Sequence, residues 1–81
     1  MEVENQEVRT EEVPTLRSIR LSKNMDVIEV AEKIGVTYMY IYMIERGIRN
    51  PGDKIKRKLA KVYGISMDEL YDAIDNTQSN I

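Results

Sequence analysis

The sequence contains neither cysteine nor histidine in its 81 residues. Without cysteine there are no disulfide bonds and no thiolate metal sites, and without histidine the side chain that most often serves as a general base is missing. Phenylalanine and tryptophan are absent too, so five tyrosines supply all of the aromatic character. We therefore expect an aliphatic core with some methionine, and we expect no metal, no cofactor and no enzymatic activity.

Long apolar runs are also absent. No stretch approaches the roughly 20 apolar residues that a membrane-spanning helix requires, and the acidic, polar N-terminus is unlike a signal peptide. A cytoplasmic protein without a membrane partner is therefore expected. Because the chain is too short to divide into two independent cores, we expect a single folded domain.

Charge is distributed unevenly along the chain, although the formal net charge is only −2. Residues 1–14 carry five acidic side chains and one basic, residues 15–67 carry five and eleven, and residues 68–81 carry four and none. Within 46–61, seven basic residues accompany the single acidic residue Asp53. Such a run indicates either a surface that contacts phosphates or an ordinary solvated helix face, and charge alone does not separate the two.

Apolar spacing divides the chain into three parts. Residues 1–14 show no sustained helical period and are expected to form an acidic, disordered arm. Residues 15–75 contain five runs of apolar residues at helical spacing, bounded by capping residues, and predict an all-α domain. The last helix is expected to end at about residue 74, and residues 76–81 are expected to form a frayed tail.

A short turn joins the second and third predicted helices. Asp26 begins the second helix with Glu29 three positions later, which is a capping-box pattern, and Gly35 ends it. Thr37 can cap the third helix, which covers about 38–46. This arrangement predicts a helix-turn-helix, whose second helix can lie in the major groove of DNA. The predicted inward face consists of Val30, Ala31, Ile34, Val36, Ile41 and Ile44.

At these residues the sequence resembles the phage-repressor class of DNA-binding domains, the Cro/cI or XRE family. The resemblance covers roughly residues 15–72 and rests on four segments: VAEKIGVT (30–37), IYMIERG (41–47), RNP (49–51) and LAKVYGISMDEL (59–70). It implies a five-helix, lambda-repressor-like bundle that contains the helix-turn-helix. In the family, an arginine of the first helix pairs with the glutamate that ends the third, and Arg20 and Glu45 occupy these positions.

The resemblance also implies a function, that of a sequence-specific transcriptional regulator, expected to be a repressor, which inserts helix 38–46 into the major groove of double-stranded DNA. It implies a homodimer formed through residues 67–74 on a palindromic operator, in the cytoplasm of a bacterium and encoded by the bacterium or a phage. The residues expected at DNA are Thr37, Tyr38, Met39, Tyr42 and Met43, with Arg46, Arg49, Asn50 and Lys54 near the phosphate backbone.

The third helix departs from the family pattern, because residues 38–43 offer phenols and thioethers where members usually display Gln, Arg, Ser, Thr or Lys. Val27 likewise replaces the glutamine that is frequent at the start of the second helix. Three interpretations remain open. The face binds DNA through apolar contacts such as those with thymine methyls; it binds a protein partner, as an adaptor of the antirepressor or antitoxin type; or part of it belongs to the core.

Overall fold

The computed structural model describes residues 13–79, and all of the regular secondary structure in this range is helical. The five helices are α1 (Leu16–Ser22), α2 (Val27–Ile34), α3 (Tyr38–Glu45), α4 (Asp53–Tyr63) and α5 (Met67–Ser79). The predicted all-α class and the five-helix bundle are thereby confirmed. Within residues 13–79, no helix is long and apolar enough to cross a bilayer. Most of the predicted acidic arm, residues 1–12, lies outside the described residues.

Local capping residues set where α1 and α2 begin. The Thr15 hydroxyl accepts a hydrogen bond from the Ser18 backbone N–H at 3.1 Å, and the Ser18 hydroxyl oxygen accepts one from the Thr15 N–H at 2.8 Å. The Asp26 carboxylate accepts a hydrogen bond from the Glu29 N–H at 2.7 Å, at the start of α2. These side chains satisfy N–H groups that have no partner inside the first turn of a helix, which is why the starts were predictable from sequence.

Left-handed backbone conformations end two of the helices. Gly35 closes α2 with a φ of 78° and Gly64 closes α4 with a φ of 67°. A side chain at such a φ is disfavoured by the clash of Cβ with the backbone, so glycine is the residue that permits these sharp exits. The exit at Gly35 directs the chain straight into Thr37 and α3, and this is the turn of the helix-turn-helix.

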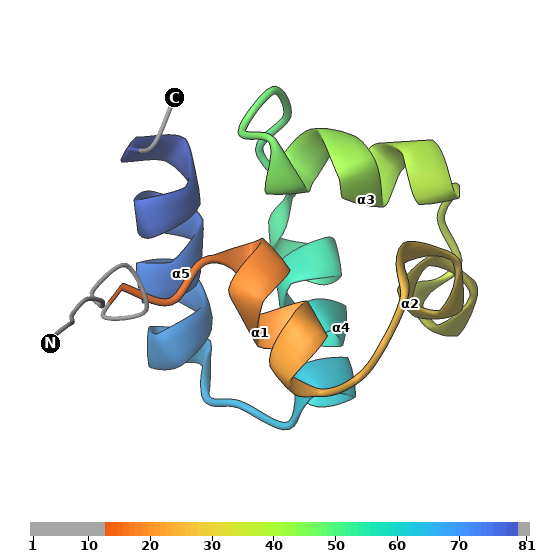
Figure 1. Ribbon diagram of the computed structural model, residues 1–81, viewed down its shortest axis with the longest axis horizontal. Coiled ribbons are helices and arrows are strands. Elements are labelled where there is room, and N and C mark those ends of the chain that lie inside the picture. Colours follow the sequence, from red (N-terminus) through yellow and green to blue (C-terminus); the bar gives the residue numbers. More distant parts are fainter. Residues whose placement is uncertain (1–12, 80–81) are drawn as a thin grey trace, which may run out of the picture.

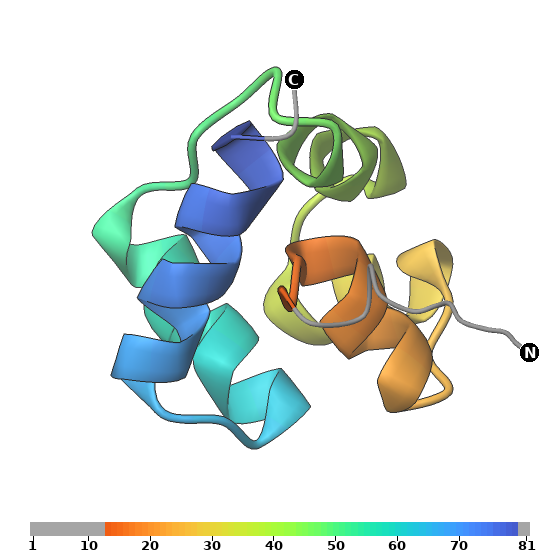
Figure 2. The ribbon, with the colours of Figure 1, turned by 60° about the vertical axis from the view of Figure 1, so that its left-hand side comes forward.

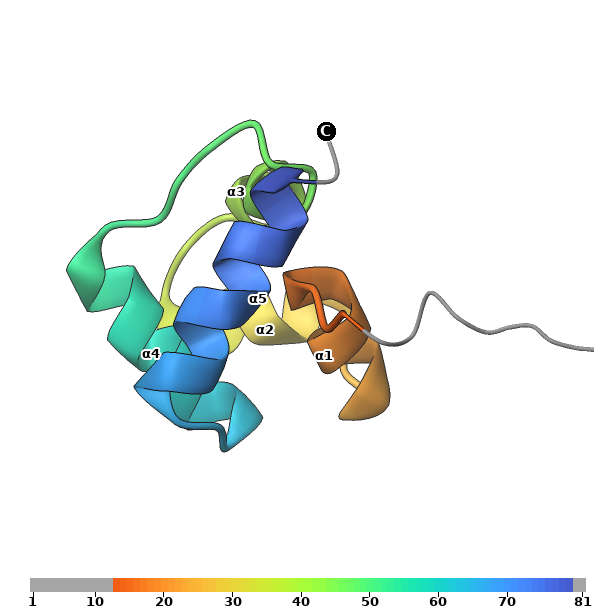
Figure 3. The ribbon, with the colours of Figure 1, turned by 90° about the vertical axis from the view of Figure 1, so that its left-hand side faces the viewer.

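The helices pack around one aliphatic core. Its buried members are Leu16, Val30, Ala31, Ile34, Ile41, Ile44, Leu59, Ala60, Tyr63, Leu70, Ala73 and Ile74. α3 lies across one end of the molecule, above α1 and α4, while α2 lies at its side (Figure 1). α5 stands between α1 and α4 and packs against both (Figure 3). The core therefore presents α3 on an outer edge of the fold, where its far side faces solvent.

The end of α5 differs from the sequence prediction. The helix continues to Ser79 rather than stopping at about residue 74, so residues 76–79 are helical and not a tail. Thr77 is buried, and its hydroxyl accepts a hydrogen bond from the Leu16 N–H at 3.0 Å while donating to the Ala73 carbonyl at 2.7 Å. The polar residues after 74 were mistaken for a solvated end because their partners lie at the start of α1.

Candidate nucleic-acid interface

α2 and α3 form the helix-turn-helix. Ala31 of α2 and the buried side chains Ile41 and Ile44 of α3 lie in the shared core, where a small residue lets the two helices approach closely. Ile41 and Ile44 are three residues apart, so they occupy the same face of α3. That face packs into the core, and the opposite face of α3 points to solvent.

A buried ion pair fixes the far end of α3 to α1. The Arg20 Nε lies 2.6 Å from Glu45 Oε2, and the second guanidinium nitrogen donates to Glu45 Oε1 at 3.0 Å. The two side chains are only 9% and 4% exposed. The third nitrogen of Arg20 donates to the Met25 carbonyl at 3.0 Å. The hydrogen bonds to Glu45 raise the pKa of Arg20, against the lowering effect of burial. The structure thus brings together the two residues that the resemblance had paired.

Three of the predicted DNA-facing residues lie on the outward face of α3. Tyr38 is 56% exposed, and Met39 and Tyr42 are each 48% exposed. Met43 is half-buried. Thr37 is exposed, and its hydroxyl accepts a hydrogen bond from the Tyr40 N–H at 3.2 Å, which caps α3. The interpretation of this face as core therefore fails for Met39, and it holds in part for Met43.

An apolar pocket of about 560 Å³ lies between this face and the start of α2. α3 contributes Tyr38, Met39 and Tyr42 to its lining, and α2 contributes Val27 and Ile28. Ile28, which is 58% exposed, was not among the predicted site residues, because the helical pattern of α2 singles out only the row of residues that point into the core. The available signal was its position, directly after Val27 and outside that row. The outward apolar surface therefore spans both helices.

Cationic side chains border the C-terminal end of α3. The Arg46 guanidinium lies 5.8 Å from the centre of the Tyr42 ring, and that of Arg49 lies 5.7 Å from the centre of the Tyr40 ring. Asn50 and Lys54, which follow these arginines in the sequence, are also exposed. The loop between α3 and α4, which carries Arg49 and Asn50, lies at the same end of the molecule as α3 (Figures 1 and 2).

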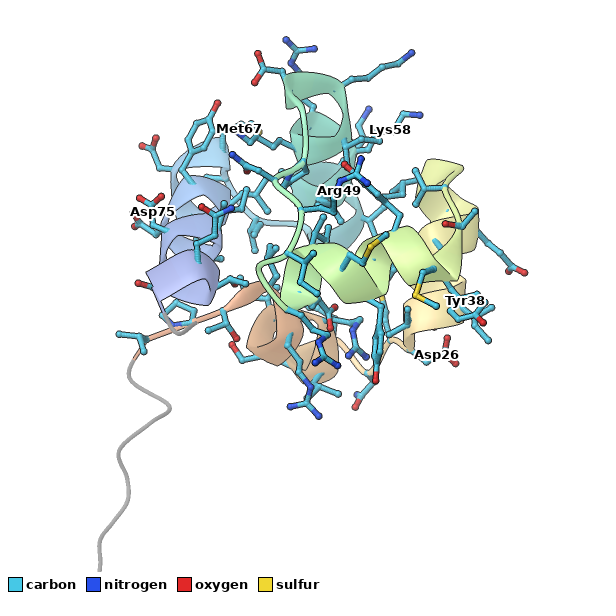
Figure 4. The ribbon with its side chains drawn as sticks, turned by 90° about the horizontal axis from the view of Figure 1, so that it is seen from above. Asp26, Tyr38, Arg49, Lys58, Met67 and Asp75 are labelled. Atoms are coloured by element: carbon cyan, nitrogen blue, oxygen red, sulfur yellow. The ribbon has the colours of Figure 1, made fainter. Side chains whose placement is uncertain are left out.

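The charge around α3 differs from one side to the other. Arg49 and Lys58 lie on the α4 side of α3, whereas Asp26 lies on the opposite side, and Tyr38 marks the start of the helix (Figure 4). Lys58 was not among the predicted site residues. Its Nζ donates to the Ile34 carbonyl at 3.2 Å, so it also ties α4 to the end of α2. A polyanion is attracted to the flank of α3 that carries Arg49 and Lys58.

In the range 13–79, no group of three or more carboxylate, histidine or cysteine side chains is placed to hold a metal ion. The arrangement offers instead an apolar helix face bordered by arginine and lysine, which suits a partner that combines apolar groups with negative charge.

The sequence that forms this site matches a known family. The model of the helix-turn-helix family, of the Cro/cI (XRE) type, matches residues 16–70 of the chain. The chain belongs to this family. The matched range extends from the start of α1 into α5 and contains the Arg20–Glu45 pair, the turn at Gly35 and all of α3.

The relatives that the chain matches are themselves named as regulators. Two strains of Mycobacterium tuberculosis each have an uncharacterized HTH-type transcriptional regulator that is 32% identical over 56 residues, which are 69% of this chain and 40% of the relative. One from Methanocaldococcus jannaschii is 30% identical over 56 residues, which are 69% of this chain and 85% of the relative. The match thus spans less than half of the mycobacterial relatives. No solved structure matches the chain.

Proposed function

We propose that this helix-turn-helix protein is a sequence-specific, DNA-binding transcriptional regulator that places α3 in the major groove. The observation that carries the proposal is the pairing of an outward α3 face with flanking cations, in a chain of this family. An α-helix fits the width of the major groove, and residues near the start of the recognition helix reach the base edges. Tyr38, Met39 and Tyr42 are the residues in that position, with Thr37 at the cap.

The phosphate contacts follow from charge. Arg46, Arg49 and Lys54 are exposed and lie after α3 in the loop and the first turn of α4, with Asn50 between them. Such cations neutralise phosphates and position the protein on the duplex without reading sequence. Stacking of the two arginines on tyrosine rings holds them near α3 and limits the number of conformations that must be lost on binding.

We further propose that the protein is a cytoplasmic repressor that binds a palindromic operator as a homodimer. A module of this size covers a short site, and pairing two modules on one duplex multiplies the specificity of a single half-site. Within 67–74, Leu70, Ala73 and Ile74 are buried in the core, so the α5 surface left for a partner centres on the exposed Tyr71. Sedimentation equilibrium of the Tyr71→Lys variant tests that contact, and the variant is expected to be monomeric. A variant that still forms the dimer would contradict an interface at Tyr71.

A fluorescence-anisotropy titration of random-sequence duplex DNA tests the nucleic-acid contact. The Arg46→Ala/Arg49→Ala variant is expected to bind more weakly and to show a plot of log affinity against log salt that is shallower by about 2 units, one for each lost phosphate contact. The matched control is Lys23→Ala/Lys61→Ala, which removes two charges from the C-terminal ends of α1 and α4. Those helix ends lie at the opposite side of the molecule from α3 (Figure 1). Equal affinity in both variants would contradict the proposed contact.

The exposed pocket supports one alternative, a protein-binding adaptor. Ile28, Tyr38 and Met39 border an apolar recess, and such patches on soluble domains often mark protein interfaces. An adaptor predicts that Tyr38→Ala and Met39→Ala matter most for partner capture and that the arginine variants leave it intact. Family membership favours the DNA contact, since the family is one of transcription regulators and is generally non-enzymatic.

A further inference from the structure

We propose that α3 selects its operator by the methyl groups of the major groove, those of thymine and of 5-methylcytosine, rather than by the hydrogen-bonding pattern of the bases. This inference rests on the proposed function, because it specifies how the same face of α3 would read a duplex. It names a substrate class, namely sites with two or three adjacent C5-methyl groups under each copy of α3.

The composition of α3 carries the first step. Residues 38–45 read YMYIYMIE and contain no Arg, Lys, Asn, Gln, Ser or Thr. Bidentate recognition of guanine or adenine requires an arginine, lysine, asparagine or glutamine side chain. Glu45 could accept a hydrogen bond from cytosine N4, but its two oxygens already bind Arg20. The helix therefore has no side chain free to make a bidentate contact with a base.

The placement of the exposed side chains carries the second step. Tyr42 lies four positions after Tyr38 and three after Met39, and all three side chains are about half exposed, so Tyr42 joins the other two in one patch. From Tyr38 to Tyr42 the helix rises about 6 Å, which matches roughly two base-pair steps of about 3.4 Å each. The C5-methyl group is the apolar group that a base pair presents in the major groove. The rings of Tyr38 and Tyr42 and the thioether of Met39 thus match methyls in chemistry, and the spacing of the two rings matches them in length.

Charge complementarity identifies the occupant of the patch as DNA. Arg46 and Arg49 lie at the end of α3 and stack on Tyr42 and Tyr40, so cation and ring are presented together. Phosphates held by these arginines would bring the groove floor against the rings, and the stacking fixes the Tyr42 ring before DNA arrives. An apolar protein surface would leave both guanidinium groups without a matching negative charge.

Replacement of thymine by deoxyuridine tests the inference directly, because it deletes the methyl group and keeps every hydrogen-bonding atom. The probe is the tightest duplex enriched from a random library, with each thymine replaced in turn. Each methyl that is buried against α3 is expected to contribute about fourfold in affinity, so two or three together give roughly 15- to 60-fold. A second selection, from a library in which every cytosine is 5-methylcytosine, distinguishes the two methyl sources by which base is enriched under α3.

Matched variants locate the effect on the helix. Met39→Ala is expected to reduce the thymine-to-uracil affinity ratio towards one at a single position. Leu21→Ala is the control, since Leu21 of α1 is 47% exposed against 48% for Met39, and it should leave the ratio unchanged. Uracil substitution that changes affinity less than twofold at every position, in a duplex that still binds, would overturn methyl readout and leave DNA binding standing. Failure to bind any duplex would overturn the proposed function together with this inference.

Discussion

Replacing Glu45 by glutamine is expected to unfold or severely weaken the domain, although the two side chains have nearly the same shape. The carboxylate accepts two hydrogen bonds from Arg20, at 2.6 and 3.0 Å, in a site where both side chains are less than a tenth exposed. The amide of glutamine offers one acceptor and turns an N–H₂ group towards the other guanidinium donor. The positive charge of Arg20 then stays buried without a hydrogen-bonded counter-charge.

The expected loss in the free energy of unfolding follows from the unpaired charge of Arg20. Removing one partner of a buried, hydrogen-bonded ion pair costs about 3 to 5 kcal/mol, against a total of about 5 to 15 kcal/mol for a typical domain. Replacing both partners, as in Arg20→Met/Glu45→Leu, removes both charges at once and is expected to restore most of the loss, because apolar side chains suit the same buried volume. The double variant should thus be more stable than either single variant.

Urea denaturation followed by far-ultraviolet circular dichroism measures the free energies of unfolding of Glu45→Gln and of a double-mutant cycle made of Arg20→Met, Glu45→Leu and the double variant. Arg17→Met serves as the control, because Arg17 is an exposed arginine on the same helix and its loss should cost less than about 0.5 kcal/mol. A Glu45→Gln variant within about 1 kcal/mol of the wild type would refute the view that this pair holds α3 in place.

Asp26→Asn should raise affinity for duplex DNA roughly two- to fivefold, because it removes a negative charge that repels phosphates beside α3. The asparagine side chain still accepts a hydrogen bond from the Glu29 N–H. An electrophoretic mobility-shift titration measures the affinity, and a reduced affinity would contradict the prediction. Thr77→Val should destabilise the fold by about 1 to 3 kcal/mol, because the buried Leu16 N–H loses its acceptor; Thr77→Ser, which keeps the hydroxyl, is the control in urea denaturation. Burial raises the pKa of Tyr63, so the unfolded chain ionises first as the pH rises above the ordinary value of about 10. Stability should therefore be intact below that pH and fall above it, and Tyr63→Phe should reduce this alkaline loss in thermal melts at neutral and alkaline pH.

Local signals made the helix starts and turns predictable. Thr15, Asp26 and Ser66 each bond a backbone N–H three residues ahead, and Gly35 needs only its own backbone to close α2. Features of this kind are decided within a few residues of the chain. Sequence reasoning therefore located the helix-turn-helix before its packing was known.

Long-range contacts were not predictable in the same way. The hydroxyl of Thr77 meets a backbone group 61 positions away, and no local pattern indicates that a threonine there ends up buried. In the sequence, Lys58 is one of several basic residues in a run, and only the fold shows that its Nζ donates to the Ile34 carbonyl. The pairing of Arg20 with Glu45 was anticipated only through the family resemblance, since nothing in residues 16–45 alone specifies that these two charges meet.

The outward face of α3 was likewise predictable in part, because its composition is local but its orientation depends on long-range packing. Its composition was visible in the sequence, but whether Met39 and Met43 pointed inward depended on how α3 settled on α2. The structure leaves Met39 exposed and adds Ile28 of α2 to the same apolar surface. The site is therefore broader than the predicted set, and it is more apolar than the family pattern implies.

Selection from a random duplex library at moderate salt tests the central claim most directly. A sequence-specific regulator predicts enrichment of a palindromic site whose half-sites are about 34 Å apart, one turn of the double helix. The Arg46→Ala/Arg49→Ala variant should fail to enrich that site. A wild-type protein that enriches no sequence over the starting library would contradict the claim that α3 reads DNA.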